Sequence, residues 1–311
     1  FSKRVNLRTV NKKSFENLAY SGAFDGFGLK RAQFFYTLPN EQVTLIEKAI
    51  KFGGQYQIAQ INAQASLFGE AFDNDIPEPK IPDCEDFPLL EQLNYERDTI
   101  GIYLTGHPLN DYQRAIQNFC NCSLTQLEKA KNKDISIGCM VTGADHRVSA
   151  NGKAFGRFIL EDYDGTHELS LFGEDYINYK NYFEKGRFLF IKGKFGPNYR
   201  GDKDELKLTQ VKLLSSVLEE MTKKITIQVP HLAVNDQFIT RLEQLCLKHP
   251  GTMQLFLHLT DAQNNYSVEL ISTKFKLAAD HRVFDTIDLW EQVSYRLNGW
   301  EQGLQVLIFQ K

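Results

Sequence analysis

The stretch AFGRFILEDYDGTHELSLF, residues 154–172, decides the fold of the central part of the chain. Residues 155–160 and 168–172 are short runs rich in large apolar side chains, as in β-strands. The run Asp162-Tyr163-Asp164-Gly165 between them has the residue types of a tight turn. The segment therefore predicts two antiparallel strands joined by a short turn, and it gives Asp162 and Asp164 a turn role in place of metal binding.

Similar signals extend this pattern on both sides. Residues 135–148 alternate between apolar and polar and lead into a hairpin turn at residues 150–153. Residues 173–184 have helical spacing, and residues 187–195 and 205–214 are again strand-like. Three strands, a helix and two strands is the order of an OB-fold, a small Greek-key β-barrel. We expect this barrel to occupy residues 135–221.

Barrels of this type bind single strands with their second and third strands and the adjacent loops, where aromatic side chains stack on bases and Arg and Lys follow the phosphates. The candidates for such contacts are Arg147, Lys153, Phe155, Arg157, Lys194 and Arg200. Phe155 and Arg157 share one face of their strand, so an exposed Arg157 implies a buried Phe158. Basic and acidic residues are nearly balanced over residues 135–215, which predicts weak, salt-sensitive binding.

Residues 1–60 are predicted to be helical. Helical spacing over residues 6–20 ends at a glycine-rich break and resumes over residues 31–38, and a further helix over 40–60 is expected to break at Gly53-Gly54. Helix, glycine hairpin and helix is the outline of a helix-hairpin-helix unit, whose glycines let backbone amides approach a phosphate. The candidates for duplex contact are Gly22, Gly26, Gly28, Lys30 and Arg31. An αα-hairpin used only for packing has the same outline.

Residues 61–88 combine a short apolar peptide, Gln64-Ala65-Ser66-Leu67-Phe68, with an acidic, proline-bearing linker. Such a linker cannot continue a helix or bury a core, so we expect it to be mobile. Leu67 and Phe68 on this linker are suited to fill an apolar cleft of a partner, with the Gln64 amide fixing the register and Ser66 lying within the motif. The alternative is that Leu67 and Phe68 fold back as a lid on their own domain.

Charge is unevenly distributed along the chain. Residues 1–51 contain nine Lys and Arg against four Asp and Glu, whereas residues 70–98 contain two against ten. A basic region beside an acidic one suggests that the first meets phosphates and the second stays in solvent.

Two further regions complete the chain. Residues 89–134 are expected to form a helical connector that turns at Thr105-Gly106-His107-Pro108, where His107 has a turn role. Residues 222–311 alternate strand and helix signals and are predicted to form a separate small α+β domain. The expected protein is therefore multi-domain: a helix-hairpin-helix region over residues 1–60, the linker, the connector, an OB-fold and the α+β domain.

Composition and motifs exclude several classes of protein. The five cysteines are scattered, which fits a reducing cytoplasm and no zinc site. No apolar run is long enough to span a membrane, and no secretory signal is present. Phe1 in place of Met indicates a fragment of a longer chain. The sequence lacks the phosphate-binding loop, zinc-protease and nucleophile-elbow motifs, which argues against a free-standing hydrolase or transferase.

Four segments, residues 21–25, 64–68, 96–108 and 152–172, together resemble the C-terminal third of bacterial replicative DNA polymerase III alpha subunits, in the order of that family. The resemblance implies a sliding clamp as the partner of Gln64 to Phe68, and the tau subunit of the clamp loader as a partner of the last domain. It also implies nucleotidyl transfer with magnesium by carboxylates of a palm domain upstream of Phe1, so no catalytic residue or cofactor is expected here.

The resulting hypothesis is a tethering part of a cytoplasmic DNA polymerase, in which residues 1–60 bind duplex, the peptide binds the clamp and the barrel binds single-stranded template. The alternative is a free-standing accessory protein whose OB-fold binds single-stranded DNA.

Overall fold

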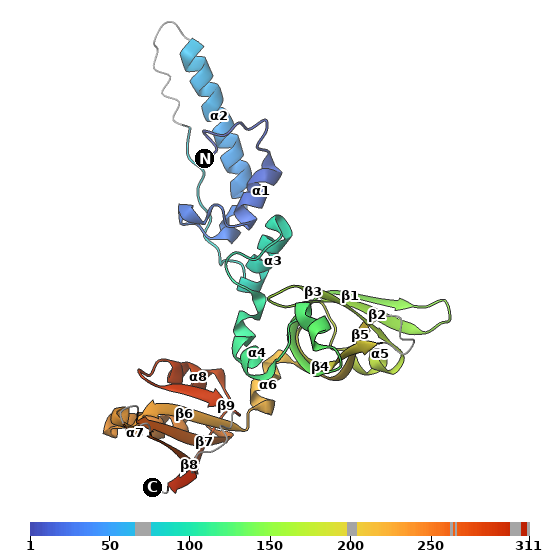
Figure 1. The fold of residues 1–311 in the computed structure, drawn as a ribbon. Coiled ribbons are helices and arrows are strands. Elements are labelled where there is room, and N and C mark those ends of the chain that lie inside the picture. Colours follow the sequence, from blue (N-terminus) through green and yellow to red (C-terminus); the bar gives the residue numbers. More distant parts are fainter. Residues whose placement is uncertain (66–75, 198–203, 262–263, 265, 299–305, 310–311) are drawn as a thin grey trace. The chain divides into compact units, whose positions relative to one another are not determined.

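The computed structural model describes residues 1–65, 76–197, 204–261, 264, 266–298 and 306–309, and the backbone alone for residues 63–65 and 306–309. The chain divides into two compact units, Phe1–Pro108 and Leu109–Lys311 (Figure 1). Among the described residues, no helix combines the length and the apolar character needed to cross a membrane.

The first unit is helical. Its elements are α1 (Lys12–Tyr20), the short 3₁₀ helices η1 (Asp25–Phe27) and η2 (Arg31–Phe34), α2 (Leu45–Ala65) and α3 (Leu89–Ile100). The Asn11 side chain accepts a hydrogen bond from the Ser14 N–H and so caps the start of α1. Phe15 and Ala19 then lie on one face of α1 and form the core with Phe24 and Ile46.

Two predictions for this unit are wrong. The helix expected over residues 31–38 is a 3₁₀ helix of four residues, so the helix-hairpin-helix outline is only partly present. Helix α2 does not break at Gly53-Gly54 but continues to Ala65. A Cβ at Gly53 would lie 2.4 Å from the Ser2 carbonyl oxygen, so this glycine serves the close approach of the N-terminal segment and not a helix end.

The linker prediction is also corrected where the structure describes it. Residues 76–88 follow the surface of the first unit and are held there by hydrogen bonds. The Asp86 carboxylate accepts from the Ala32 N–H at 3.1 Å, and the Gln33 amide donates to the Pro82 carbonyl at 2.6 Å. This part of the linker is therefore bound to its own unit, because its carbonyls and carboxylates meet donors there.

The second unit begins with η3 (Pro108–Tyr112), α4 (Gln113–Phe119) and η4 (Leu124–Ala130) and continues into a five-stranded sheet. The strands are β1 (Asp134–Val148), β2 (Ala154–Glu161), β3 (Thr166–Phe172), β4 (Phe188–Pro197) and β5 (Asp204–Leu213), with α5 (Gly173–Tyr179) between β3 and β4. The sheet order is β3-β2-β1-β4-β5, because the first half of β1 pairs with β4 and its second half with β2. This arrangement confirms an OB-fold-like antiparallel sheet domain, called the barrel below, whose core includes Phe158, Phe183 and Leu189.

The remainder of the second unit is the predicted α+β part. Helix α6 (Leu214–Met221), which the sequence analysis does not anticipate, follows the barrel. The elements after it are β6 (Lys224–Pro230), η5 (His231–Ala233), α7 (Asp236–Lys248), β7 (Pro250–Asp261), β8 (Tyr266–Leu277), α8 (His281–Asp288), β9 (Ser294–Leu297) and β10 (Val306–Phe309). Their sheet has the order β10-β8-β7-β6-β9, with α7 as the crossover between the parallel strands β6 and β7.

Candidate nucleic-acid interface

The outer face of β1, β2 and β3 carries a row of three side chains at matching positions. Arg147 on β1 pairs in register with Phe155 on β2, which in turn pairs with Phe172 on β3. Directly opposite residues of neighbouring strands point to the same face of a sheet. The row therefore places two aromatic rings beside a guanidinium on the hairpin that extends from the barrel (Figure 1).

The two rings of this row form a stack that is partly exposed to solvent. The centroids of Phe155 and Phe172 lie 5.3 Å apart with an angle of 16° between the planes, and 59% of Phe172 is exposed. An unpaired base can stack on such a surface, because every base has an aromatic face. We call Arg147, Phe155, Arg157 and Phe172 the aromatic platform.

The second row of the same face supplies further charge. Arg157 pairs in register with Asp145 on β1 and with Ser170 on β3, and it is exposed. Phe158, its neighbour in sequence, is fully buried, as the alternation predicts. The Arg147 Nε donates to Asp145 Oδ2 at 2.7 Å, which raises the pKa of Arg147 and offsets part of the positive charge of the platform.

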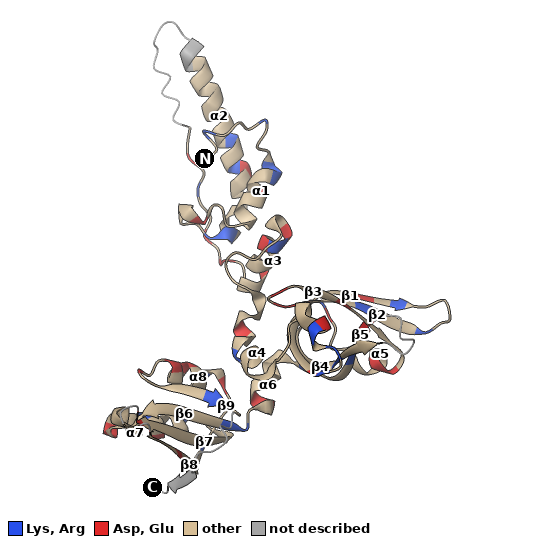
Figure 2. Ribbon diagram, in the orientation of Figure 1, with Lys and Arg blue, Asp and Glu red and all other residues tan. Residues whose placement is uncertain are grey.

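The remaining barrel candidates lie in different places. Lys153 lies in the exposed turn between β1 and β2, next to the platform, and Figure 2 shows other basic segments along this hairpin. Lys194 pairs with Asp134 at the opposite end of β1, with 3.3 Å between the charged atoms, so the structure does not bring it to the platform. Arg200 lies outside the described residues.

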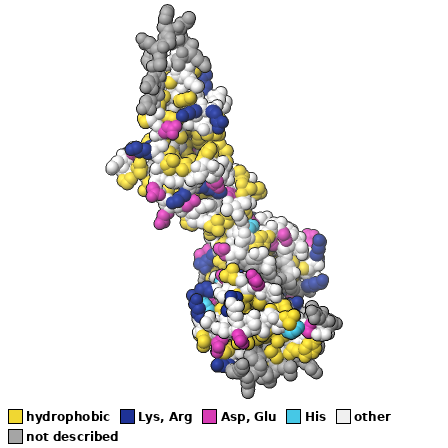
Figure 3. All heavy atoms as spheres, turned by 90° about the vertical axis from the view of Figure 1, so that its left-hand side faces the viewer, with side chains coloured by type: hydrophobic (Ala, Val, Ile, Leu, Met, Phe, Trp, Pro, Cys, Tyr) yellow, Lys and Arg dark blue, Asp and Glu magenta, His cyan; other side chains and the backbone are white. Residues whose placement is uncertain are grey.

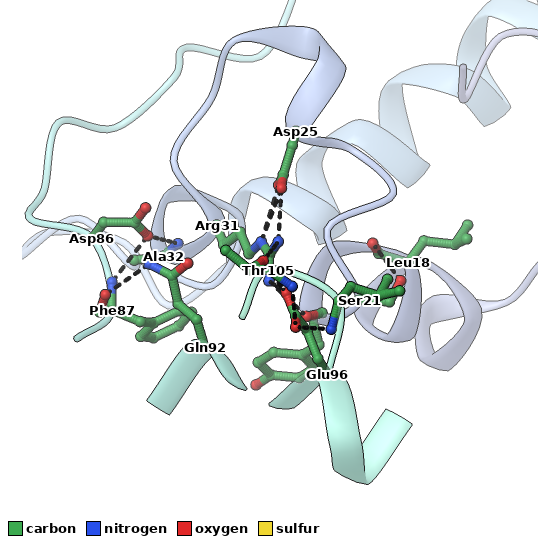
Figure 4. A network of polar contacts seen from close by, with 12 residues as sticks. Leu18, Ser21, Asp25, Arg31, Ala32, Asp86, Phe87, Gln92, Glu96 and Thr105 are labelled. Atoms are coloured by element: carbon green, nitrogen blue, oxygen red, sulfur yellow. Dashed lines mark hydrogen bonds and ion pairs between the residues drawn. The ribbon is translucent and has the colours of Figure 1, made fainter. Parts of the chain in front are cut away.

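Arg31, a predicted duplex contact, is instead part of a buried network in the first unit (Figure 4). Only 6% of the residue is exposed, and its Nη1 donates to Glu96 Oε1 at 2.8 Å while its Nη2 donates to Asp25 Oδ2 at 2.7 Å. These contacts raise the pKa of Arg31 further above its usual value, chiefly through the hydrogen bonds with Asp25. The prediction for Arg31 is therefore corrected: its guanidinium is committed to carboxylates inside the protein.

Glu96 on α3 is the centre of this network and is completely buried. It accepts hydrogen bonds from the Leu104 N–H at 2.7 Å, the Thr105 N–H at 3.0 Å and the Thr105 hydroxyl. Burial by itself raises the pKa of Glu96, but the hydrogen bonds from Thr105, Arg31 and Leu104 outweigh burial and lower it to about 2. The network thus joins η2, α3 and the turn before Pro108 within one unit.

The glycines of the predicted hairpin have two different roles. A Cβ at Gly22 would lie 2.2 Å from Arg31 Nη2, and Gly22 has a φ of 80°, so this glycine makes room for the buried guanidinium. A Cβ at Gly26 or Gly28 would meet nothing within 4 Å, which leaves both glycines open to an approaching ligand. Lys30 is exposed, and its Nζ donates to the Cys84 carbonyl at 2.9 Å.

Of the predicted clamp peptide, only the first residues belong to the described chain. Gln64 and Ala65 form the last turn of α2, and their side chains are not described. Ser66, Leu67 and Phe68 lie outside the described residues. The choice between a docking peptide and a lid therefore stays open.

The part of the chain that the structure describes contains no set of side chains that could bind a metal ion. No group of three or more His, Cys, Asp or Glu side chains there could hold an ion. The Asp162 carboxylate instead accepts from the N–H groups of Asp164, Gly165 and Leu124, which confirms its turn role. The family resemblance assigns the catalytic magnesium ion to a palm domain outside this chain, so Asp162 and its neighbours are not its expected ligands.

Sequence reasoning missed two features of these sites. The partner of Arg31, Glu96, is 65 positions away in sequence, and no local pattern connects them. Asp145 could have been found, because its spacing of two from Arg147 places both side chains on one face of a strand.

Comparisons with known proteins agree with this picture. Residues 225–298 match the family model described as "DNA polymerase III alpha subunit, C-terminal domain". The DNA polymerase III subunit alpha of Bacillus subtilis is 25% identical over 302 residues, which cover 96% of this chain and 26% of that protein. The subunit of Escherichia coli K12 is 29% identical over 262 residues, 82% of this chain and 22% of that protein. The chain thus spans about a quarter of the length of these relatives.

Among solved structures, the second OB-fold domain of replication protein A from Methanococcus maripaludis aligns with 30% of this chain and 94% of that domain, at 18% identity and a TM-score of 0.22. This score is too low to support an argument, so the description of the barrel rests on its own strand order.

Proposed function

We propose that this chain, which corresponds to the C-terminal region of the DNA polymerase III alpha subunit family, keeps a replicative DNA polymerase on its template. Nucleotidyl transfer with magnesium belongs, in this proposal, to the parts of the polymerase that this chain does not span. The role of the chain is tethering: several weak contacts, each to a different partner, act together through their linkage.

The aromatic platform is the observation that carries the proposal. Its stacked rings and flanking arginines offer a surface for bases together with charge for phosphates, which is the combination that single strands require. The acidic partner of Arg147 and the balanced charge of the barrel suit a contact that releases the template at every step. We therefore assign the barrel to the single-stranded template ahead of the primer end.

A titration with a labelled single-stranded oligonucleotide tests this assignment. Changing Phe155 and Phe172 to Ala should weaken binding at least about tenfold, because each lost base stack costs about 1–3 kcal/mol. Tyr266→Ala removes an aromatic ring that is 62% exposed in the α+β part and should leave the affinity unchanged. Equal affinities of the double variant and the parent chain would refute the template-binding role.

The clamp contact is proposed from Gln64, Leu67 and Phe68. A peptide of micromolar affinity, about 8 kcal/mol, is sufficient when DNA contacts raise the effective concentration of the clamp. Changing Leu67 and Phe68 to Ala should abolish binding to the clamp in calorimetry. Ile58→Ala with Ile61→Ala removes two exposed apolar side chains of α2, only a few positions earlier, and is the matched control. Unchanged clamp affinity of the Leu67/Phe68 variant would contradict the proposal.

Binding of duplex DNA is proposed for the first unit. No atom would contact a Cβ at Gly26 or Gly28, so DNA can approach the backbone there, although the Gly28 N–H itself donates to the Asp25 carbonyl. This region also has an excess of basic residues, whose side chains can meet phosphates. Titration of the chain with a labelled duplex is the direct test.

The tau subunit of the clamp loader is proposed as a partner of the α+β part. An apolar cavity of about 430 Å³ lies there, lined by Phe238, Leu242, Leu257, Leu270 and Phe275 among others, and it can accept apolar side chains of a partner. Figure 3 shows hydrophobic side chains on the surface of this part. Ile239→Asp, at the partly exposed rim, should abolish capture of tau, whereas Leu289→Asp, at an exposed position outside the cavity lining, should not.

The alternative of a free-standing single-strand-binding accessory protein is not favoured. The similarity to polymerase subunits extends over as much as 96% of the chain and is not confined to the barrel. A barrel of nearly balanced charge is also poorly suited to strong binding by itself.

A further inference from the structure

The positive charges of the first unit fall into two groups. Some are already neutralised by carboxylates of the same unit, as in the ion pairs Lys3–Glu78, Lys12–Glu47, Lys48–Glu41, Arg97–Asp98 and Arg31 with Asp25 and Glu96. Arg4, Arg8, Lys13 and Lys51 are all exposed, and none of them has an ion pair with any residue that the structure describes. We call these four residues the basic face.

The segment that carries Arg4 and Arg8 is held rigidly against α2. The Gln57 amide of α2 donates to the Val5 carbonyl at 2.8 Å and to the Ser2 carbonyl at 3.2 Å. Asn6 fixes the next turn, because its side chain accepts from the Arg8 N–H at 3.0 Å and its carbonyl from the Val10 N–H at 2.9 Å. The backbone that carries the two arginines is therefore held in place by hydrogen bonds.

Packing directs these arginines outward. Val5, Leu7 and Val10 pack against the core of the first unit, which leaves Arg4 and Arg8, between and beside them, in solvent. The apolar residues thus anchor a segment in which Lys3 pairs with Glu78, whereas Arg4 and Arg8 have no ion pair with a described residue.

Two contacts place Lys51 of α2 near Arg8 and Lys13. Lys12, beside Lys13, binds Glu47 of α2 at 2.9 Å, and Leu7, beside Arg8, is 3.7 Å from the Cβ position of Gly54. Lys51 lies between these positions on one face of α2, four residues after Glu47 and three before Gly54. Figure 2 shows basic segments of the N-terminal loop, of the start of α1 and of α2 around this region.

We propose that the basic face, Arg4, Arg8, Lys13 and Lys51, binds the phosphate backbone of duplex DNA. This inference rests on the proposed duplex binding of the first unit and assigns the contact to residues other than the buried Arg31. Residues 4–13 contain no aromatic side chain, so this surface offers charge without base stacking, which suits a duplex whose bases are already stacked. Phosphate contacts carry no sequence information, so the binding is independent of DNA sequence.

The test uses the 311-residue chain with Arg4, Arg8 and Lys13 changed together to Gln. Fluorescence anisotropy with a labelled duplex at several KCl concentrations gives the affinity and its salt dependence. Loss of three phosphate contacts should make the negative slope of log K against log[KCl] shallower by about 3. The loss of affinity should be the same for two duplexes of unrelated sequence.

The matched control changes Lys129, Lys133 and Lys185, three exposed lysines of the second unit, to Gln. It removes the same net charge and should leave the slope within error of the parent. Circular dichroism of both variants shows whether either change disturbs the fold, which exposed Arg and Lys to Gln substitutions should not do.

Three results would overturn the inference, and they are distinguishable. A parent chain that does not bind duplex at all overturns the proposed duplex binding together with the basic face. A parent that binds, with equal losses in the two triple variants, overturns the basic face alone. If the Arg4/Arg8/Lys13 variant loses affinity for poly-glutamate by the same factor as for duplex, the basic face binds anions in general. This result overturns its assignment to DNA.

Discussion

Arg31 in the first unit and Arg157 in the barrel are both predicted from the sequence to touch DNA, yet the structure uses them in opposite ways. Arg31 is buried between Asp25 and Glu96, whereas Arg157 is exposed beside the stacked rings of the aromatic platform and has no ion pair with a described residue. The two arginines are chemically identical, so the difference lies entirely in what surrounds them.

The comparison shows that a basic residue near glycines is weak evidence for a phosphate site. A buried carboxylate without a cation is very unfavourable, and the buried Glu96 is therefore paired with the Arg31 guanidinium. Where the carboxylate is exposed, as Asp145 is, the ion pair with Arg147 contributes little and leaves the arginine free to exchange partners. Asp25 is as exposed as Asp145 and also binds Arg31. It is therefore the burial of the guanidinium together with Glu96 that makes Arg31 structural, whereas the exposed Arg147 stays available for binding.

The largest effect that distinguishes the two arginines is on stability. Arg31→Ala leaves Glu96 buried without a cation and should lower the free energy of unfolding of the first unit by about 3–5 kcal/mol. Hydrogen exchange of α1 and α3 measures this loss in the first unit alone. Arg157→Ala, at an exposed position, should change stability by no more than about 0.5 kcal/mol.

The double variant Arg31→Met with Glu96→Met provides the control for this result. Replacing both charged groups by apolar ones removes the uncompensated carboxylate, so the double variant should be more stable than Arg31→Ala. The single variants Arg31→Met and Glu96→Met complete the cycle. A double variant whose loss of stability equals the sum of their losses would show that the pair does not interact.

The second prediction concerns pH. The pKa of Glu96 is about 2 in the folded protein against an ordinary value of 4.5, so the folded state binds fewer protons between these values. The stabilisation is present above about pH 4.5 and is lost as the pH falls towards about 2. Glu96→Gln should therefore flatten the acid limb of the stability profile of the first unit. An acid limb unchanged in this variant would assign it to other carboxylates, such as Glu47, whose pKa is also lowered to about 2.

The sequence could predict the barrel well because its signals are local. Strand runs and turn residues follow one another within a few positions, and the period of two separates the exposed Arg157 from the buried Phe158. The same reasoning could not find the role of Arg31, since Glu96 reaches it from another helix. It also misjudged Gly53, whose neighbour Ser2 is visible only in the folded chain.

The sequence was similarly insufficient for the helix expected over residues 31–38. Four or five apolar residues fit an α-helix and a 3₁₀ helix equally well, so periodicity alone cannot distinguish them. The outcome depends on tertiary contacts: the Ala32 N–H is bound by Asp86 and the Gln33 side chain by Pro82, both from the linker. These contacts from the linker satisfy polar groups of η2, so the chain does not have to continue as an α-helix.

The third prediction returns to the exposed arginine. Arg157→Ala should weaken binding of a single-stranded oligonucleotide several-fold and make the negative slope of log K against log[salt] shallower by about 0.7, because one phosphate contact is lost. Lys185→Ala, an exposed charge elsewhere in the barrel, is the matched control and should leave the slope unchanged. If both variants make the slope shallower by the same amount, Arg157 has no specific contact with the strand. Arg157 could then no longer stand as the DNA-binding counterpart of Arg31.

The smallest effect is expected at Asp145, the acid beside the platform. Asp145→Asn removes the partner of Arg147 and should raise the affinity for single strands about twofold at low salt, since an exposed ion pair competes only weakly with a phosphate. The gain should disappear at high salt, where the charges are screened. Glu219→Gln removes an equal charge from α6, where the carboxylate is exposed and no platform residue lies on the same element or on the one immediately before it in sequence. An equal gain in that variant would attribute the effect to net charge. A gain confined to Asp145→Asn would show that the exposed acid restrains Arg147 only weakly. The contrast is with Arg31, which the buried Glu96 holds inside the first unit.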